Sequence, residues 1–326
     1  MASDHELALE GLHTRPANVP LWSENFAWDG FDPAVGVGVL LHLGRSPAGP
    51  ELWRSWAVAY LPGETLVVAK AVGPGADGIG SGPLSLTCRE PMRRWDVRFR
   101  GAGRPTGRAE LAADRIVDGE VVGLDIDLTF TSATPIWDMG AMHSLGETHY
   151  EQHGHWRGTV TAAGTTYPID TTGYRDHSTG KRDLAGLGGH VWAHAIFPSG
   201  RAFSLLRVHT PDGRLATSEG AVLHDGVLTS AVPQSTPGFD EVIGNPPGGT
   251  ITFAEHRPID VEVLHGVTLT LGQPNDFFFG RDRAPGRKVM TDCPVRVQWD
   301  GEVTTGWLER SRIFTDGGQP PWLLNR

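Results

Sequence analysis

The chain has 326 residues, enough to bury a large core in one large β-domain or in two domains. Its 38 acidic residues outnumber 28 basic ones, and the formal net charge of −10 argues against a nucleic acid or an anionic membrane surface as a partner. Glycine (43 residues) and proline (24) are abundant although 39% of the residues are hydrophobic, which is typical of many turns between short strands rather than of disorder.

Targeting and redox signals are sparse. Cys88 and Cys293 are the two cysteines, so neither a disulfide framework nor a thiolate metal site is predicted. The first twenty residues are polar and lack the basic start and apolar run of a secretory signal. No window approaches 18 uninterrupted apolar residues, which predicts no membrane span. We therefore expect a cytoplasmic protein, and we find no motif for a cofactor.

Taken in chain order, the predicted elements are mostly strands. A Pro-Gly turn at residues 62–63 separates strand-like runs at 52–60 and 65–70, which predicts a hairpin. Alternation of apolar and polar residues predicts half-buried strands at 95–100 and 122–130, and short helical turns are expected at 108–113 and 137–144. Further strands are expected at 156–162, 190–197, 202–209, 221–223, 227–230, 250–254, 261–271, 295–299 and 304–312.

The spacing of these strands predicts an all-β fold. Asp225-Gly226 and Asp300-Gly301 stand where two-residue hairpin turns would be expected, and no repeat of 20–50 residues indicates a propeller or solenoid. Short strands separated by turns indicate a sandwich or a barrel. We predict two domains, residues 1–170 and 171–326, with a dense polar segment near their boundary, where ligand pockets are common.

The segment 149–156 carries one of two clusters of reactive side chains. On a strand, alternate residues share a face, so His149, Glu151, His153 and His155 would lie together. Three imidazoles and a carboxylate suit a divalent metal such as zinc, a proton-transfer network, or a polar strand face bonded to its neighbours. A metal is the least favoured of the three, because ligands from a single strand rarely complete a tetrahedron.

The second cluster is the segment from Gly173 to Asp183, which holds two acids, a histidine, a serine and three bases. Neighbours on an extended segment point in opposite directions, which argues against a locally assembled Ser–His–Asp triad. One interpretation is a buried Arg–Asp junction between two domains. In the other, Asp176 donates or accepts a proton, His177 orients it, and Arg175 holds a substrate carboxylate or phosphate.

Five blocks together resemble a known family. They are Glu24-Asn25-Phe26, His42-Leu43-Gly44-Arg45, His149 to Gly154, Gly173 to Asp183, and Gly306-Trp307-x-Glu309-Arg310. Over nearly the whole chain they resemble a broad group of bacterial proteins related to carotenoid 1,2-hydratase (hydroxyneurosporene synthase). The Arg-Asp-His-Ser block is the specific part of the likeness, and Thr179 departs from the tryptophan that usually follows it.

The resemblance implies two lipocalin-like β-barrels or sandwiches in tandem, with an apolar cavity near their junction. It also implies hydration of isoprenoid double bonds, terpenoid cyclisation or pericyclic cyclisation, with a hydrophobic small molecule as substrate and no redox cofactor. Chemically, a carboxyl buried among apolar walls stays protonated near neutral pH and can protonate an alkene. Aromatic faces would then stabilise the carbocation by about 0.5–2 kcal/mol each.

On this basis we predict Asp176 as the acid, with Glu151 next and His177 as its orienting group. Tyr150 or His153 would place the water. The predicted aromatic walls are Trp137, Trp156, Trp192 and Phe279. Two other functions stay open: a lipocalin-like carrier that binds an apolar ligand without chemistry, and a metal-dependent hydrolase or lyase that uses the 149–155 strand.

Overall fold

The computed structural model describes residues 4–45, 49, 51–75, 78–116, 119–139, 148–182, 184–237, 248–272, 276–282, 284 and 286–313. Within these ranges the chain is almost entirely β-structure and forms two compact units. The first unit comprises Met1–Pro105 and Gly119–Asp183, and the second comprises Thr106–Asp118 and Leu184–Arg326. The predicted fold class, two lipocalin-like β-domains in tandem, is confirmed.

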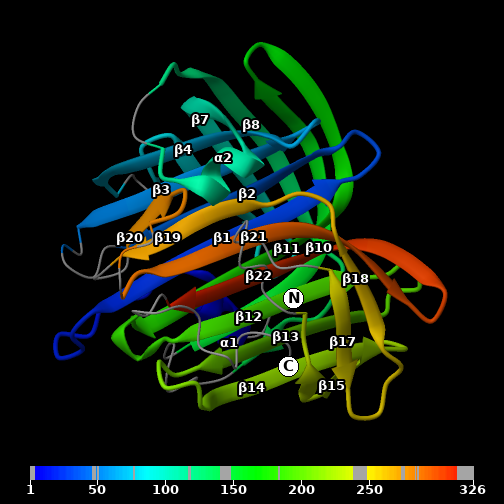
Figure 1. Ribbon diagram of the computed structural model, residues 1–326. Coiled ribbons are helices and arrows are strands. Elements are labelled where there is room, and N and C mark those ends of the chain that lie inside the picture. The colour runs from blue at the N-terminus through cyan, green and yellow to red at the C-terminus, as the bar shows by residue number, and fades with distance from the viewer. Residues whose placement is uncertain are drawn as a thin grey trace. The chain divides into compact units, whose positions relative to one another are not determined.

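The first unit is built on one large curled sheet. Its strands follow the order β4-β3-β2-β1-β11-β10-β8-β7-β6-β5, and β4 also pairs with β7, which closes eight of these strands into a ring (Figure 1). The elements of this unit are α1 (Asp4–Glu10), β1 (Trp22–Asp32), β2 (Val37–Arg45), β3 (Leu52–Leu61), β4 (Thr65–Pro74), β5 (Ile79–Ser81), β6 (Leu84–Glu90), β7 (Arg94–Gly107), β8 (Val122–Ser132), β9 (Trp137–Asp138), β10 (Thr148–Ala162) and β11 (Thr165–Lys181).

The second unit repeats this plan. Its strand order is β15-β14-β13-β12-β22-β21-β18-β17-β16, and the final strand β22 (red in Figure 1) lies between β12 and β21. Its elements are α2 (Arg108–Ala113), η1 (Leu184–Gly186), β12 (Gly189–Ile196), β13 (Ala202–His209), β14 (Leu215–His224), β15 (Val227–Ser230), β16 (Pro233–Ser235), β17 (Gly249–Phe253), β18 (Ile259–Val263), β19 (Val267–Gly272), β20 (Asp276–Phe279), β21 (Lys288–Trp299) and β22 (Glu302–Ile313).

The segment 106–118 lies in sequence between two strands of the first unit but belongs to the second. It carries α2, which contacts β19, and Arg115 forms an isolated antiparallel bridge with Gly280. Gly280 has a φ of +91°, and a Cβ at this position would lie 2.2 Å from the carbonyl oxygen of Asp114. Glycine is therefore required where this segment joins the sheet.

The compact units do not divide the chain after residue 170, the predicted boundary. That position falls inside β11, which pairs without a break from Thr165 to Thr179 with β10 and from Gly173 to Lys181 with β1. In sequence the first unit ends at Asp183. The polar segment that was expected at a domain junction is instead the second half of β11, a long central strand. Asp183 itself lies outside the described residues.

Each sheet buries one side in an apolar cluster. In the first unit Phe26 and Trp28 of β1 point into this core, together with Trp156 of β10. The indole of Trp156 lies over the paired Gly30 and Gly173, where a Cβ would approach its Cδ1 atom to 2.5 and 2.1 Å. Its Nε1 donates a hydrogen bond to the Asp29 carbonyl at 2.7 Å. Trp156, predicted to face a substrate, is thus a core residue.

The predicted hairpin turns are present. Asp225 and Gly226 join β14 to β15 with φ values of 50° and 76°, and Asp300 and Gly301 join β21 to β22 with 49° and 84°. Two successive positive φ angles define the type I′ turn that matches the twist of antiparallel strands. In the part of the chain that the structure describes, no helix has the length and apolarity needed to cross a membrane.

Candidate functional site

The candidate site lies on the side of the first sheet that faces away from its core. Register places Glu151 of β10 opposite Asp176 of β11, and Tyr174 of β11 opposite both His153 and Asp29. Phe26 and Trp28 of β1 face the core, so the residues of β1 that alternate with them face outward. The outward side chains from the three central strands β1, β10 and β11 include Asp29, His149, Glu151, Tyr174 and Asp176.

Asp176 is held by a histidine of the neighbouring strand. His149 Nε2 contacts the Asp176 carboxylate and lies 3.3 Å from Glu151 Oε1. Burial opposes a charge on the imidazole, but the carboxylates of Asp176 and Glu151 raise the pKa of His149 to about 10. Burial also acts to raise the pKa of Asp176, yet the positive charges of His149 and Arg182 lower it. The pair is therefore ionised at neutral pH.

This state differs from the role predicted for Asp176. The predicted role requires an acid that stays protonated in apolar surroundings, whereas Asp176 is a carboxylate with a cationic partner. That partner is His149 and not the predicted His177, because adjacent residues of a strand point to opposite sides. Ser178 Oγ, itself bonded by Arg182, donates a further hydrogen bond to Asp176 at 3.4 Å.

The protonated acid of this cluster is Asp29. Asp29 is 2% exposed, and burial raises the pKa of its carboxyl well above the ordinary value. The negative charges of Glu151 and Asp176 raise it further. A carboxylic acid in such a setting keeps its proton at neutral pH. Asp29 of β1 thus provides the protonated carboxyl that was predicted for Asp176 of β11.

Aromatic and imidazole side chains complete this side of the sheet. The hydroxyl of Tyr174 donates a hydrogen bond to Glu151 Oε2, and His153 packs edge-on against the Tyr174 ring at 4.4 Å between ring centroids. His42 of β2 stacks on Trp56 at 5.2 Å, and burial together with the charge of Arg54 lowers the pKa of His42 to about 3. His42 is therefore neutral at physiological pH.

Arg175 and Tyr150, both predicted to bind substrate, lie on the core side. There they hold the carboxylate of Glu10, the last residue of α1. Arg175 Nη1 lies 3.1 Å from Glu10 Oε1, the Tyr150 hydroxyl donates to Oε2 at 2.9 Å, and Trp95 Nε1 donates to Oε1 at 2.5 Å. The Glu10 and Arg175 residues are only 4% and 2% exposed. This is a buried structural ion pair with its hydrogen bonds made within the chain.

His177 belongs to a second polar group on the core side. Its ring stacks on Phe26 at 3.9 Å, and its Nε2 lies 3.2 Å from Glu24 Oε1. His13 donates its backbone N–H to the same oxygen at 2.9 Å, and Arg45 Nη2 lies 3.4 Å from Oε2. Burial acts to raise the pKa of Glu24, but the bonds from His13 and His177 lower it to about 2. Glu24 is therefore an ionised carboxylate at neutral pH.

Three of the predicted aromatic walls, Trp137, Trp192 and Phe279, come from both units. Trp137 of β9 is partly buried and pairs in register with Glu151. Trp192 and Phe279 belong to the second unit, in which Trp192 packs edge-on against His194 at 4.8 Å. Their placement around a common substrate stays a prediction, as does the apolar cavity near the junction.

The second unit carries its own chain of polar groups, on the side of its sheet away from the core. Ser311 Oγ lies 2.6 Å from His190 Nδ1, and His190 Nε2 contacts Glu309. Trp307 Nε1 donates to the carboxylate of Asp292 at 3.2 Å. Burial, followed by the charge of Glu309, raises the pKa of Asp292 well above its usual value.

Among the residues that the structure describes, two groups of side chains could offer three ligand atoms each to a metal ion. One is His149, Glu151 and Asp176, and the other is His13, Glu24 and His177, with the ligand atoms of each group within 4.8 Å of one another. His155, predicted to join a metal face, is exposed, and neither it nor His153 belongs to these groups. A metal on the first group would also have to displace the proton from His149, since metal ligation requires neutral imidazole.

Sequence analysis missed Asp29, Glu10 and His13. No strand was predicted at 22–32, although alternation was legible there: Phe26 and Trp28 mark one side, which assigns Asp29 to the other. Glu10 offered no comparable signal, because its partners Arg175 and Trp95 lie far along the chain.

The comparisons with known proteins agree with this architecture. A family model described as a domain of unknown function, DUF7064, matches residues 6–313. The chain belongs to this family. A sequence search of curated proteins gives no match.

Three solved structures share the DUF7064 protein's fold at low sequence identity. An AttH-type protein from Nitrosomonas europaea is 13% identical, with a TM-score of 0.61 over 89% of this chain and 91% of that one. Kievitone hydratase from Nectria haematococca is 12% identical, with a TM-score of 0.54 over 90% and 89%. CghA is 12% identical, with a TM-score of 0.57 over 92% and 90%. These likenesses show that the two-unit β-fold is shared across nearly the whole length of each chain.

Proposed function

We propose that this protein is a cofactor-independent acid–base catalyst that hydrates, cyclises or isomerises an apolar, isoprenoid-type small molecule. The observation that carries the proposal is the buried carboxyl of Asp29, whose pKa is raised well above its ordinary value by burial and by the nearby Glu151 and Asp176. Such an arrangement can donate a proton and then stabilise the positive charge that results.

In the proposed reaction Asp29 transfers its proton to one carbon of a trisubstituted alkene. A C–H bond forms, the O–H bond of Asp29 breaks, and the positive charge resides on the tertiary carbon. Water, or a hydroxyl or alkene of the same substrate, then attacks that carbon. Attack by water or a hydroxyl releases the proton of that O–H group, whereas attack by an alkene forms a C–C bond and a new carbocation, which then loses a proton from an adjacent carbon. In each case the proton returns to the Asp29 carboxylate, so the cycle needs no external oxidant or reductant.

The remaining outward residues have distinct parts in this scheme. Protonated His149 keeps Asp176 ionised, so Asp176 does not compete with Asp29 for a proton. Tyr174 fixes the Glu151 carboxylate through its hydroxyl. Glu151 and Asp176 thereby serve as anchored negative charges next to the acid, which favours a carbocation over the neutral alkene.

The fold comparisons support the reaction class without naming a substrate. One neighbour is by name a hydratase, and its chain and this one cover each other almost completely. The shared fold is also compatible with simple carriage of a ligand. The dense cluster of carboxyl groups favours catalysis, because an apolar ligand that is only bound gives no reason to bury three acids together.

The test is product formation in heavy water. Wild-type protein is incubated in D₂O with kievitone and, separately, with acyclic isoprenoid alcohols such as geraniol, and the products are analysed by mass spectrometry. We expect a hydrated or cyclised product that carries one deuterium on carbon. Asp29→Asn should lower its rate by about 100-fold or more, since general acid catalysis is worth about 10²–10⁴-fold, while tryptophan fluorescence shows unchanged binding.

Asp127→Asn is the matched control, because Asp127 is an exposed carboxylate of the same unit, paired with Arg98. Full activity of Asp29→Asn together with loss in Asp176→Asn would return the acid role to Asp176. Binding of either compound without any product, before or after substitution, would leave the carrier function and remove the enzyme.

The metal-dependent alternative rests on the group of His149, Glu151 and Asp176. Elemental analysis of the purified protein distinguishes it. A stoichiometric divalent metal that is lost in His149→Gln, together with activity that chelators abolish, would favour this alternative over the proposal.

A further inference from the structure

The two units can be aligned strand by strand through a short repeat. Gly173-Tyr174-Arg175-Asp176-His177-Ser178 lies on β11, and Gly306-Trp307-Leu308-Glu309-Arg310-Ser311 lies on β22. Each strand stands between the first strand of its unit, β1 or β12, and the preceding long strand, β10 or β21. The register positions along these strands therefore correspond, and a side chain that one unit has and the other lacks is not required by the shared fold.

The acid and the imidazole on the core side of the first sheet are such a difference. Glu24 of β1 and His177 of β11 have Gly189 of β12 and Arg310 of β22 as their counterparts in the second unit. The second sheet forms with neither a carboxyl nor an imidazole at these two positions. The pairing of Glu24 with His177 is therefore a property of the first unit alone.

Two imidazole nitrogens converge on one oxygen of Glu24. His13 Nδ1 lies 3.0 Å and His177 Nε2 lies 3.2 Å from Glu24 Oε1, and the backbone N–H of His13 donates to the same oxygen at 2.9 Å. A carboxylate oxygen has two lone pairs, so three donors crowd it. Glu24 Oε2 is buried and accepts no hydrogen bond within the described part of the chain, although Arg45 Nη2 lies 3.4 Å away. Hydrogen bonding thus accounts for this arrangement only in part.

The same three side chains suit the ligands of a tetrahedral metal ion. Zn²⁺ lies about 2.0–2.2 Å from imidazole nitrogen and carboxylate oxygen, which sets the ligand atoms of a tetrahedral site about 3.3–3.6 Å apart. The two nitrogen–oxygen distances of 3.0 and 3.2 Å are slightly shorter, and all three ligand atoms lie within 4.8 Å of one another. A small movement of each ring away from Glu24 admits the ion.

Protonation and access also fit a metal ion. Burial lowers the pKa of His177 although Glu24 acts to raise it, so the imidazole is neutral, and Glu24 is ionised. Neutral imidazole and ionised carboxylate are the forms that a metal ion binds. The His13 side chain is 25% exposed, whereas those of Glu24 and His177 are 0% and 3% exposed. An ion can therefore enter on the His13 side, where water can take the fourth position.

The backbone of His13 holds this residue in place. Its N–H donates to Glu24, and its carbonyl oxygen accepts a hydrogen bond from Arg45 Nη1 at 3.2 Å. The Arg45 guanidinium also lies over the rings of Trp22 and Trp53, 5.4 and 4.8 Å from their centroids, so it keeps partners when Glu24 binds a cation. Its positive charge opposes such a cation, and removal of that charge should raise the affinity.

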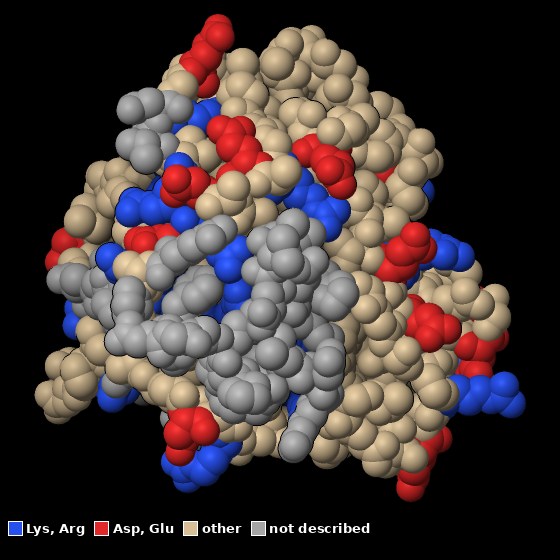
Figure 2. Space-filling view, in the orientation of Figure 1, with Lys and Arg blue, Asp and Glu red and all other residues tan. Residues whose placement is uncertain are grey.

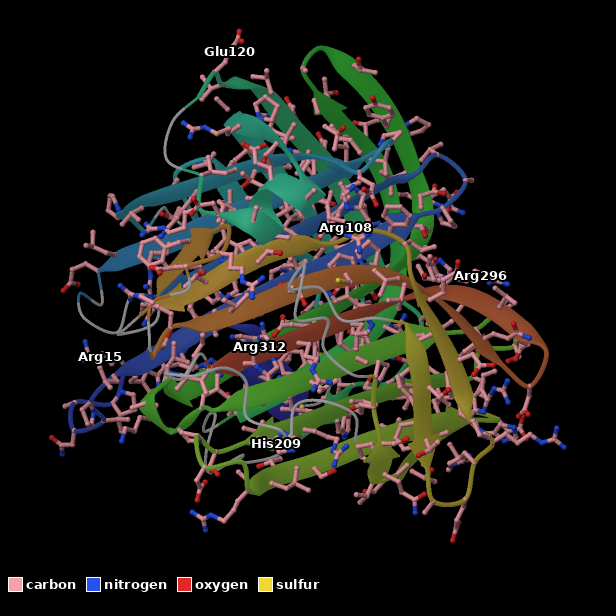
Figure 3. All side chains as sticks on the ribbon, in the orientation of Figure 1. Arg15, Arg108, Glu120, His209, Arg296 and Arg312 are labelled. Carbon is pink, nitrogen blue, oxygen red and sulfur yellow. The ribbon has the colours of Figure 1, made fainter. Side chains whose placement is uncertain are left out.

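We propose that His13, Glu24 and His177 bind a divalent transition-metal ion, and that Zn²⁺ matches these two imidazoles and one carboxylate. The ion fastens the segment 11–21 to β1 and β11. Figure 3 marks this segment by its label on Arg15, two residues after His13. The site lies on the core side of the sheet and Asp29 on the outward side, so binding of the ion is independent of the proposed reaction.

The experiment measures binding of Zn²⁺ to the full chain. Protein stripped with a chelator is titrated with zinc chloride by calorimetry, and Tm is recorded with and without the metal. Acidic and basic side chains are interspersed on the face shown in Figure 2, and magnesium chloride at about 5 mM occupies such exposed carboxylates without competing for imidazole. We expect about one equivalent of Zn²⁺ to bind and Tm to rise by about 2–4 °C.

His13→Gln, at a partly exposed residue outside the strands, should weaken Zn²⁺ binding about tenfold or more and remove the rise in Tm. Arg45→Gln should have the opposite effect on affinity, because it removes a positive charge beside the ion. His155→Gln, at an exposed histidine of the same unit, is the matched control and should bind Zn²⁺ as the unchanged protein does.

Two results would overturn the proposal. Loss of binding in His149→Gln but not in His13→Gln would place the metal on the outward group of His149, Glu151 and Asp176. No binding heat, or weak binding of several equivalents that none of the substitutions changes, would mean an adventitious ion only. The readouts are heat and Tm, so failure of the proposed reaction leaves this test unaffected.

Discussion

The two units use the same backbone frame for the outward sides of their sheets and fill it with similar groups. Asp176 of the first unit corresponds to Glu309 of the second, and Glu151 corresponds to Asp292. In both units an aromatic residue two positions before the first acid donates a hydrogen bond to the second acid: Tyr174 bonds Glu151, and Trp307 bonds Asp292. The pairing of two acids with an aromatic donor is thus a property of the repeated frame.

The histidines beside these acids differ, and so do their charges. His149 reaches Asp176 from β10, where the second unit has Met290, whereas His190 reaches Glu309 from β12, where the first unit has Asn25. The pKa of His149 is raised to about 10, but burial and the charge of Arg310 lower the pKa of His190 to about 4 despite Asp292. The shared backbone register places the acids at equivalent positions, whereas the charges of nearby side chains determine which histidine is protonated.

The largest expected loss of stability comes from replacing a residue of the first unit by its counterpart in the core of the second unit. Arg175 corresponds to Leu308, and Arg175→Leu would leave the Glu10 carboxylate buried without its guanidinium partner. Removal of one member of a buried ion pair costs about 3–5 kcal/mol. We expect the free energy of unfolding measured in urea to fall by this amount, which moves the unfolding midpoint to lower urea concentration.

The partner substitution shows whether the charge or the packing is responsible. In the double variant Arg175→Leu with Glu10→Gln, the uncompensated charge is gone and part of the stability should return. Arg98→Leu, at an exposed arginine of the same unit, serves as the control and should change little. Equal losses in the single and double variants would mean that the pair acts by packing alone.

The next effect is a difference in pH dependence between the units. His149 binds its proton more tightly in the folded than in the unfolded protein, so its contribution to stability is complete below pH 6.5 and is lost as the pH rises toward 10. For His190 the folded pKa is below the unfolded value, so stability is lost as the pH falls from 6.5 through about 4.

Urea unfolding across pH 4 to 10 gives the free energy of unfolding as a function of pH. The alkaline limb of this curve reports His149, and the acid limb reports His190. His149→Gln should flatten the alkaline limb, by about 2–4 kcal/mol in total, and leave the acid limb unchanged. His190→Gln should do the reverse, while the acid loss due to Glu24 (pKa about 2) persists below pH 4.5 in both. If both variants flatten the same limb, the assigned protonation states are incorrect.

The smallest effect is expected from the two aromatic donors. Tyr174→Phe keeps the ring and removes the hydroxyl that bonds Glu151, which should cost about 1–2 kcal/mol. Trp307→Phe removes the corresponding N–H to Asp292 and should cost a comparable amount plus the loss of packing. Thermal unfolding measures both, and Tyr167→Phe, at a tyrosine elsewhere on β11, is the control. A neutral Tyr174→Phe would show that Glu151 does not depend on this bond.

The strand pattern of this chain could be predicted from sequence because its signals are local. Alternation located β8, and the Pro-Gly and Asp-Gly turns located three hairpins. The central strands β1, β2 and β11 were not predicted. Polar residues stand on the core side of β1 and β11, as Glu24, Arg175 and His177 do, and apolar Leu40 of β2 stands on the outward side. Such a composition hides the apolar alternation on which strand prediction depends.

The sequence could single out the two polar segments of the candidate site but not the role of each residue. Residues 149–153 and 174–178 do lie side by side, as two adjacent strands. Which carboxyl keeps its proton could not be predicted, because it depends on cross-strand neighbours: Asp29 faces two carboxylates, whereas Asp176 faces a protonated imidazole. Protonation is set by tertiary contacts, and these are invisible to spacing along one strand.

The segment 106–118, which lies in sequence within the first unit and contributes α2 to the second, has a consequence for the way the chain can be cut. Dividing the chain at one position cannot give two complete units, because a fragment that begins at residue 184 lacks α2 and the Arg115 bridge to Gly280. During synthesis this segment leaves the ribosome long before β19, its partner in the sheet. The second unit therefore begins to be synthesised before the first is finished, and it is complete only in a chain that contains both of its parts.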